Sequence, residues 1–133
     1  MAKIHPDQVD LGELSIRTLW TCPPTVNVRD AVYQTGANAV DQADNGSTTT
    51  MPCVGIVQSK PSPTTCYVTR QGIVNGFTPA TFIPKEIYYV GTTGSLVNGP
   101  GVPSSPGTVV HEVGFAKNDT TLVVVIDQDY TVL

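Results

Sequence analysis

The segment VGIVQSKPSPTTCYV at residues 54–68 has a counterpart, VGFAKNDTTLVV, at residues 113–124. Each segment consists of a short apolar run that contains a glycine, a polar loop, and a second run rich in β-branched residues. Runs of this kind, bounded by Pro, Asn and Asp, are typical of paired β-strands joined by a turn. We therefore expect two β-hairpins of the same design, one in each half of the chain.

A second pair of matching segments precedes these hairpins. Residues 29–33 (RDAVY) lead to a turn at Gly36 and a short apolar return, and residues 85–89 (KEIYY) lead to Gly94 and a similar return. The pieces follow the same order in both halves, although the loops between them differ in length. The sequence thus predicts an all-β fold, a small barrel or sandwich built from a duplicated two-hairpin unit.

Composition and charge agree with one small β-domain. The chain has 133 residues, of which only 14% are charged, and its formal net charge is −4. A chain of this length can bury a core without disulfides, and a net negative charge does not attract nucleic acid. No apolar run reaches the roughly 18 residues of a membrane span, and the N-terminus lacks a secretion-signal pattern. We expect synthesis in the cytoplasm, with neither nucleic acid nor membrane as a partner.

The first 20 residues differ from the rest of the chain. We place an N-terminal arm at residues 1–20 and a single barrel or sandwich domain at residues 21–133. One interpretation makes residues 14–20 the first strand of the barrel and residues 1–13 a tail. The other is an arm that lies on a neighbouring molecule by pairing with a sheet edge. The contact residues would then be Ile4, Leu11, Leu14, Ile16, Leu19 and Trp20.

The remaining strands follow from apolar runs between turn residues. They are expected at residues 26–33, 39–41, 53–58, 65–70 with a continuation past a bulge at Gly72, 86–90, 95–98, 109–116 and 121–127. The consecutive apolar residues 122–126 predict burial on both faces, in a central strand or against a partner. Either this run, with Val124 at its centre, or the N-terminal arm is accordingly expected to be buried between subunits. Phe77 and Phe82 are expected to hold a loop on the core.

The sequence shows no reactive constellation typical of an enzyme. His5 and His111 are the only histidines, one in the tail and one in a predicted strand. No nucleophile elbow, phosphate-binding glycine loop or metalloprotease motif occurs. Asp119, Asp127 and Asp129 lack the spacing of a calcium loop. We expect no enzymatic activity, no cofactor and no metal site.

Two other sets of residues allow alternatives. Cys22, Cys53 and Cys66 cannot all pair within the chain and lack the spacing of a zinc site. We interpret them as buried small apolar side chains, with a Cys53–Cys66 bridge or an intermolecular bond as the alternative. Trp20 and the Tyr88–Tyr89 pair are the aromatic side chains that a sugar-binding platform would use, although at most one of the two tyrosines can face a ligand because neighbours on a strand point opposite ways. Packing in the core or an interface is the favoured interpretation.

The order of these motifs resembles that of small β-domains in tailed-bacteriophage virions. The likeness covers roughly residues 26–127. The domains in question include capsid decoration (cement) proteins and related domains of head and tail fibres. The motifs that carry it are DAVY at 30–33, VGIV at 54–57, GIV at 72–74, YYV at 88–90 with Gly94 and Leu96, VGFA at 113–116 and TLVV at 121–124.

The resemblance implies a structural virion protein that binds the outer surface of a capsid and stabilises it, commonly as a homotrimer. The implied partners are the major capsid protein and further copies of the chain, and the implied location is the capsid surface. A fibre or adaptor domain is the first alternative, and a carbohydrate-binding module is the second. No contact residues are carried over from the family, so the arm residues and Val124 are predicted on physical grounds alone.

Overall fold

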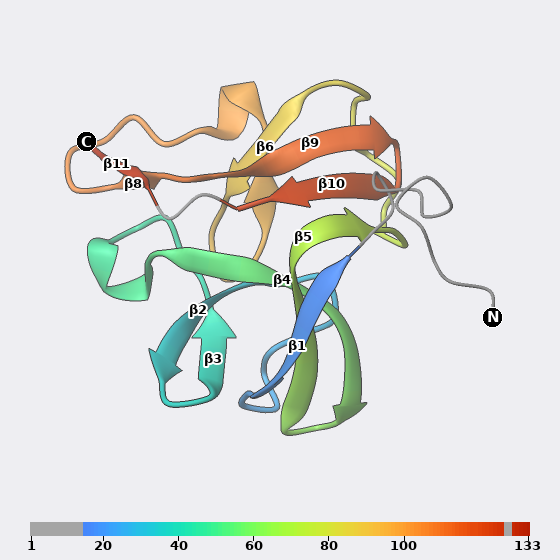
Figure 1. Ribbon diagram of the computed structural model, residues 1–133. Helices are drawn as coiled ribbons and strands as arrows, with labels where there is room; N and C mark the ends of the chain where they lie inside the picture. The colour runs from blue at the N-terminus through green and yellow to red at the C-terminus, as the bar shows by residue number, and fades with distance from the viewer. Residues whose placement is uncertain (1–14, 127–128) are drawn as a thin grey trace, which may run out of the picture.

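The computed structural model describes residues 15–126 and 129–133, and these residues form strands and loops with little helix (Figure 1). The strands are β1 (Ile16–Thr21), β2 (Ala31–Gly36), β3 (Ala39–Gln42), β4 (Cys53–Ser62), β5 (Thr65–Val74), β6 (Ile87–Val90), β7 (Leu96–Val97), β8 (Val109–Val110), β9 (Glu112–Asn118), β10 (Thr121–Val125) and β11 (Thr131–Val132). Two short 3-10 turns are η2 (Thr48–Thr50) and η3 (Gly99–Gly101). Within the described ranges no helix is long and apolar enough to cross a membrane. The predicted all-β class is confirmed.

The first five strands close into a small barrel. Their order is β1-β3-β2-β4-β5, and the pairing of β5 with β1 completes the ring. The contact between β1 and β3 is parallel and short, and the other pairs are antiparallel. The interior is filled by small apolar side chains: Cys22, Val26, Val32, Val40, Val57, Cys66 and Val68, with Trp20 and Val54 packed against them. Closure pairs the edges that an open sheet would leave free.

Strand β5 belongs to both halves of the molecule. It is ten residues long, and its first part pairs with β1 and β4 inside the barrel. Its last part, residues 71–74, pairs with β10, from which β9, β6 and β7 continue the sheet. Figure 1 shows the barrel strands below and β6, β9 and β10 above, with β5 passing between them. The strand therefore continues past Gly72, as expected from the sequence.

The two halves repeat the same hydrogen-bonding pattern. In unit 1 (β2–β5), β2 pairs with β3 and β4, and β4 pairs with β5. In unit 2 (β6–β10), β6 pairs with β7 and β9, and β9 pairs with β10. Arg29 and Lys85 both have a positive φ, 80° and 75°, and their amides donate to the carbonyls of Val57 and Ala116 at 2.7 and 2.9 Å. The amides of these two acceptor residues donate in return to the residues after Arg29 and Lys85. The predicted duplication is confirmed.

Unit 2 packs on the outside of unit 1. Val32 and Val57 of unit 1 face the barrel interior, whereas Ala31 and Ile56 belong to a second core, which we call the inter-unit core. Unit 2 contributes to this core the residues equivalent to the barrel lining of unit 1: Tyr88, Ala116, Leu122 and Val124. The inner face of unit 2 thus covers the outer face of unit 1, and the two units are stacked in the same orientation.

The loop before β6 is held on the inter-unit core by aromatic side chains. The rings of Phe77 and Phe82 lie 4.7 Å apart between centroids, and Phe82 lies 4.5 Å from Tyr88. Phe77 is buried, and Phe82 packs against the same core. The expectation that these two phenylalanines hold the loop on the core is confirmed.

Two predicted strands are shorter than expected. Residues 26–30 form turns, and β2 begins at Ala31, because the amide of Asp30 donates to Asn27 O at 3.1 Å and Arg29 takes a left-handed conformation. Val26 is nevertheless buried in the barrel core. Its apolar side chain therefore fits the sequence pattern of a strand although its backbone is not paired in one. The strand expected at residues 109–116 is interrupted at His111, and β8 pairs with β11 instead.

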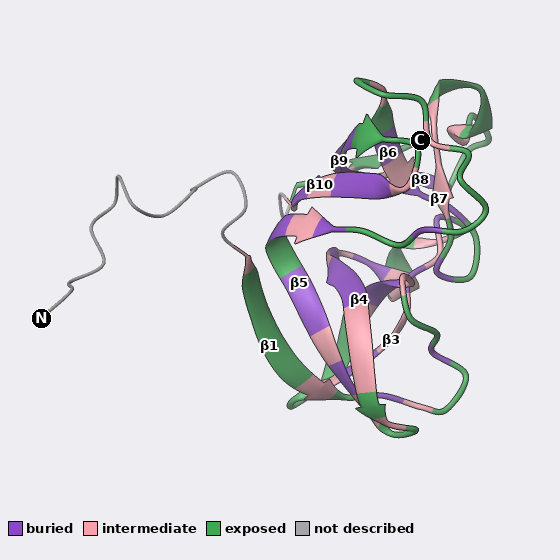
Figure 2. Cartoon of the chain, turned by 90° about the vertical axis from the view of Figure 1, so that its right-hand side faces the viewer, coloured by how far each residue is buried: buried purple, intermediate pink, exposed green. Residues whose placement is uncertain are grey.

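The boundary of the arm at residue 20 needs correction, and the interpretation of residues 14–20 as the first strand of the barrel is confirmed for its described part. Residues 16–20 belong to β1 and close the barrel. Figure 2 shows β1 along the side of the molecule, exposed over most of its length. The other arm residues that we singled out, Ile4, Leu11 and Leu14, lie outside the described residues.

The apolar strand at residues 122–126 is central, as expected, but only one of its faces is covered. β10 lies between β5 and β9, and the side chains of Leu122 and Val124 are fully buried in the inter-unit core. Val125 on the opposite face is 53% exposed. The expectation that Val124 is buried between subunits is therefore wrong, because its side chain packs inside its own chain.

Val124→Asp is expected to prevent folding, because it places a carboxylate in a core without a partner for the charge. The matched change Val125→Asp on the same strand should leave a cooperative thermal transition, since that side chain is exposed. Circular dichroism during heating measures both. A folded Val124→Asp chain with an unchanged transition would contradict the packing described above.

Gly114→Ala is expected to destabilise the fold by about 3 kcal/mol or more, because the strands leave no room for a methyl group. A Cβ at Gly114 would collide with the carbonyl oxygen of Val123. At Gly55, the equivalent residue of unit 1, it would lie 2.5 Å from the carbonyl oxygen of Thr69. Gly36→Ala is the control, since a Cβ there would meet nothing within 4 Å. Equal urea midpoints for the two variants would refute the prediction.

Candidate functional site

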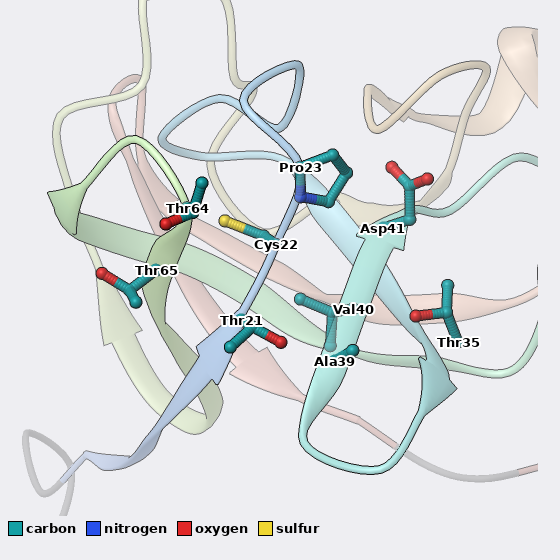
Figure 3. Close-up of a pocket in the computed structure, with 9 residues that line it drawn as sticks. All are labelled: Thr21, Cys22, Pro23, Thr35, Ala39, Val40, Asp41, Thr64 and Thr65. Carbon is teal, nitrogen blue, oxygen red and sulfur yellow. The ribbon is translucent and has the colours of Figure 1, made fainter.

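An open hollow of about 510 Å³ lies where the end of β1, strand β3 and the turn between β4 and β5 meet (Figure 3). Its lining contains four threonines, the thiol of Cys22 and the carboxylate of Asp41. Pro23 follows Cys22 directly and also lines the hollow, so the chain leaves β1 here without a further ladder donor. The hollow has room for a small molecule, and the Cys22 thiol is a nucleophile that could react with one.

Three polar side chains of this hollow make hydrogen bonds within the fold. The hydroxyl of Thr21 donates to Asn38 O at 3.0 Å, and the hydroxyl of Thr65 lies 2.7 Å from that of Ser62. A carboxylate oxygen of Asp41 accepts the amide of Gln42 at 2.7 Å. The lining contains no histidine and no second carboxylate, so no general base lies beside Cys22. The arrangement does not provide the parts of a nucleophilic active site.

The neighbour of the Cys22 thiol is a second thiol. Trp20 is paired with Cys66 across β1 and β5, and the amide of Cys22 donates to Thr64 O at 3.0 Å. Cys22 and Cys66 therefore occupy diagonal positions on the same face of this strand pair, and both side chains pack in the barrel core. Burial and the contact with Cys22 raise the pKa of Cys66 to about 12.

The third cysteine lies in the other core. Cys53 packs in the inter-unit core, whereas Cys22 and Cys66 pack in the barrel. All three are buried free thiols, which confirms their interpretation as buried side chains. The alternative of a Cys53–Cys66 bridge is wrong, because the two residues face different cores.

His111 has a structural position. It is fully buried, its Nδ1 accepts the amide of Cys53 at 3.2 Å, and its ring lies 5.8 Å from that of Tyr130. This contact connects β4 to the segment between β8 and β9, across 58 residues of sequence. No sequence signal points to it, because neither residue stands in a recognisable motif.

Two of the aromatic residues that a sugar-binding platform would use, Trp20 and Tyr88, are turned inward, whereas Tyr89 is half-buried. The Trp20 indole N–H donates to the hydroxyl of Thr18 at 2.6 Å, and the ring packs against the barrel core. Tyr88 is buried, and its hydroxyl accepts the amide of Ile83 at 2.9 Å. Trp20 also borders a small pocket of about 260 Å³ at the barrel side, below the usual volume of a ligand site. These two side chains therefore do not form an exposed stacking surface.

The outer face of unit 2 carries a line of four apolar side chains, one from each of four adjacent strands. Ile87 on β6 is opposite Phe115 on β9, Phe115 is opposite Val123 on β10, and Val123 is opposite Ile73 on β5. Residues directly opposite each other share a face of the sheet, so these four form a continuous surface, which we call the apolar row. Ile87 and Phe115 are 43% and 44% exposed.

The duplication shows why the apolar row is unusual. Two of its residues, Ile87 and Phe115, have Ala31 and Ile56 as equivalents in unit 1, and both equivalents are fully buried under unit 2. At these two positions the same face is therefore covered in unit 1 and open in unit 2. In stacked repeats a terminal unit needs a polar outer face or a cover, and exposed apolar patches commonly mark interaction sites. The apolar row is the best candidate for a partner-binding site.

The predicted contact residues divide between several places. Ile16 is paired with Gln71, which is paired with Val125, so Ile16 adjoins the surface that contains the apolar row. Leu19 is 54% exposed on β1, opposite Tyr67, and lies away from that row. Ile73, Ile87, Phe115 and Val123 were missed by sequence reasoning. The pairing order of the strands brings these four residues together. In the sequence, only the match between the two units could have suggested a shared face.

Two further observations bear on the site. In residues 15–126 and 129–133, no group of His, Cys, Asp and Glu is arranged to hold a metal ion. No protein-family model, curated protein or solved structure matches the chain. The apolar row is therefore identified as a candidate site from the geometry of this chain alone.

Raising the pH from about 8 to about 10 is expected to lower the free energy of unfolding by about 1 kcal/mol through Cys53. Burial raises the pKa of Cys53 from its ordinary value of 9.0 to about 12. The unfolded chain therefore ionises first, and the contribution is complete below pH 9 and lost as the pH rises toward 12. Urea unfolding at several pH values measures it. The Cys53→Ala variant should show a smaller loss, and an identical pH dependence would contradict the assignment.

Proposed function

We propose that this chain is a structural protein that binds the outer surface of a phage capsid and stabilises it, with the apolar row as its main contact. The observation that supports the proposal is the exposure of Ile87 and Phe115 on unit 2, whose counterparts in unit 1, Ala31 and Ile56, are covered by protein. Burying such side chains on a partner removes apolar surface from water, at about 25 cal/mol per Å². A face of this kind supplies binding energy without a reactive group.

The apolar row has a rigid support. Its residues lie on four paired strands, and the opposite face of the same sheet is fixed in the inter-unit core. Binding therefore does not have to order a loop, and less conformational entropy is lost on docking. This suits a protein that makes the same contact many times over a lattice, where weak contacts add up.

The choice of a capsid as the partner comes from the motif order in the sequence, which resembles that of decoration proteins. In such a role the partners are the major capsid protein and further copies of the chain, arranged as a homotrimer around a threefold axis. In the described part of the chain, Cys22 has a thiol rather than a base beside it, which favours a binding role over catalysis. The inward positions of Trp20 and Tyr88 weigh against a carbohydrate-binding module.

A fibre or adaptor domain is the second candidate function, because the same apolar row would serve a contact within a tail. Copy number separates the two functions. Quantitative mass spectrometry of purified virions should find the chain in a simple ratio to the major capsid protein if it decorates the head. A few copies per particle would place it in the tail or fibres, and its absence from particles would overturn the capsid proposal.

Phe115→Asp and Ile87→Asp are each expected to weaken binding to capsids by at least about tenfold, because each places a charge in a contact that must lose its water. Leu19→Asp is the matched control, since Leu19 is also an exposed apolar residue on a strand but lies outside the apolar row. Sedimentation of the chain with capsids that lack it measures the binding. If Leu19→Asp abolished binding and Phe115→Asp did not, the contact would lie on β1 instead.

A further inference from the structure

Two thiols lie together at the strand that closes the barrel, and the proposed function does not use them. Cys22 follows β1 directly, and Cys66 lies on β5. Both side chains belong to the barrel core. Strand β1 is held to β3 by a single register pair, Thr21 with Ala39, so the pairing of β1 with β5 carries most of the closure.

We propose that Cys22 and Cys66 form a redox-active dithiol, which a low-molecular-weight disulfide such as glutathione disulfide oxidises to an intramolecular disulfide. The proposal concerns a covalent modification site and does not depend on the capsid function.

Strand pairing places the two cysteines on the same face of the sheet and in the same core before any reaction. Cys66 is paired with Trp20, and Cys22 lies two residues after Trp20 on the same face. The amide of Cys22 is fixed on Thr64 O at 3.0 Å, so the backbone on both sides is held by strand pairing. A disulfide requires close Cα positions and side chains directed at each other. Both side chains point from the same face into the same core. Because diagonal positions on paired strands lie about 7–8 Å apart, the bond forms with a small approach of β1 to β5, which is possible because a single register pair holds β1 on β3.

The two cysteines differ in their access to solvent. Cys22 is 6% exposed and lines the hollow of about 510 Å³, whereas Cys66 is fully buried. Figure 3 shows the sulfur of Cys22 directed toward Thr64, within the labelled lining of that hollow. A small disulfide can therefore reach Cys22 first, and Cys66 only through Cys22. This assigns Cys22 as the attacking thiol and Cys66 as the resolving thiol.

The reaction is a sequence of two thiol–disulfide exchanges. The Cys22 thiol loses its proton to solvent, and its thiolate attacks one sulfur of glutathione disulfide, which forms a mixed disulfide and releases one glutathione. The Cys66 thiol then loses its proton and attacks the Cys22 sulfur, which releases the second glutathione. The protein loses two electrons and two protons, and glutathione disulfide gains them. Because burial keeps Cys66 protonated, the second exchange should become faster as the pH rises.

The new bond would fix the closing strand of the barrel. It would connect the segment after β1 to β5 and enclose residues 22–66 in a covalent loop. A loop of that length removes many conformations from the unfolded chain. The oxidised protein should therefore melt roughly 10 °C above the reduced protein.

The experiment uses the whole chain, incubated with glutathione disulfide and examined by intact-mass spectrometry. The expected product has lost two hydrogens, carries no glutathione, and retains one thiol that reacts with an alkylating agent after denaturation. Dithiothreitol should reverse both the mass change and the rise in melting temperature. A digest with trypsin alone does not identify the partner of Cys22, because Pro61 after Lys60 leaves Cys53 and Cys66 on one peptide.

Three variants identify the two cysteines that form the disulfide. Cys53→Ala is the matched control, because Cys53 is buried in the other core and its loss leaves only Cys22 and Cys66 to pair. This variant should still lose two hydrogens, whereas Cys22→Ala and Cys66→Ala should not. A lasting glutathione adduct on Cys22, a disulfide-bonded dimer, or the absence of oxidation in Cys53→Ala would overturn the proposal. If Cys66→Ala failed to fold, the native chain and Cys53→Ala would still decide the question.

Discussion

The inter-unit core holds the two halves of the chain in one arrangement. Ala31 and Ile56 enter it from the barrel, and Leu122 and Val124 enter it from the second unit. Each of these side chains is fully buried, so neither unit can turn relative to the other without exposing apolar surface to water. The position of the apolar row follows from this contact, because the face of unit 2 that is not packed on the barrel is the face that carries it.

Strand β5 makes this stacking possible without a flexible connection. One continuous strand pairs with β1 and β4 in the barrel and then with β10 in unit 2. The strands pass closely at Gly55 and Gly114, the same position of the two units, where a side chain would collide with the neighbouring strand. The repeated glycine is therefore a packing requirement of the fold, and it explains why this residue type stands at the centre of both matching segments.

Much of the fold could be predicted from local pattern, and less of the site could. The hairpins follow from runs of β-branched residues between turns, and their repetition from the matching order of segments. The left-handed backbone at Arg29 has no signature in a non-glycine residue, so the start of β2 was misplaced. In residues 122–126 every side chain is apolar, so the sequence does not show which of them are buried. Only the packing of unit 2 on the barrel shows that Leu122 and Val124 are covered. The contacts of Cys22 with Cys66 and of His111 with Cys53 join distant segments and depend on strand order.

The closure of the barrel by β1 also limits how copies of the chain can associate. The inner face of unit 1 would otherwise be free to cover the apolar row of another molecule, just as the inner face of unit 2 covers unit 1. Such a head-to-tail contact could continue from molecule to molecule and give an open filament. Because β1 completes the barrel, that inner face is filled within its own chain. The first strand thus removes the open inner face that such a stack would need.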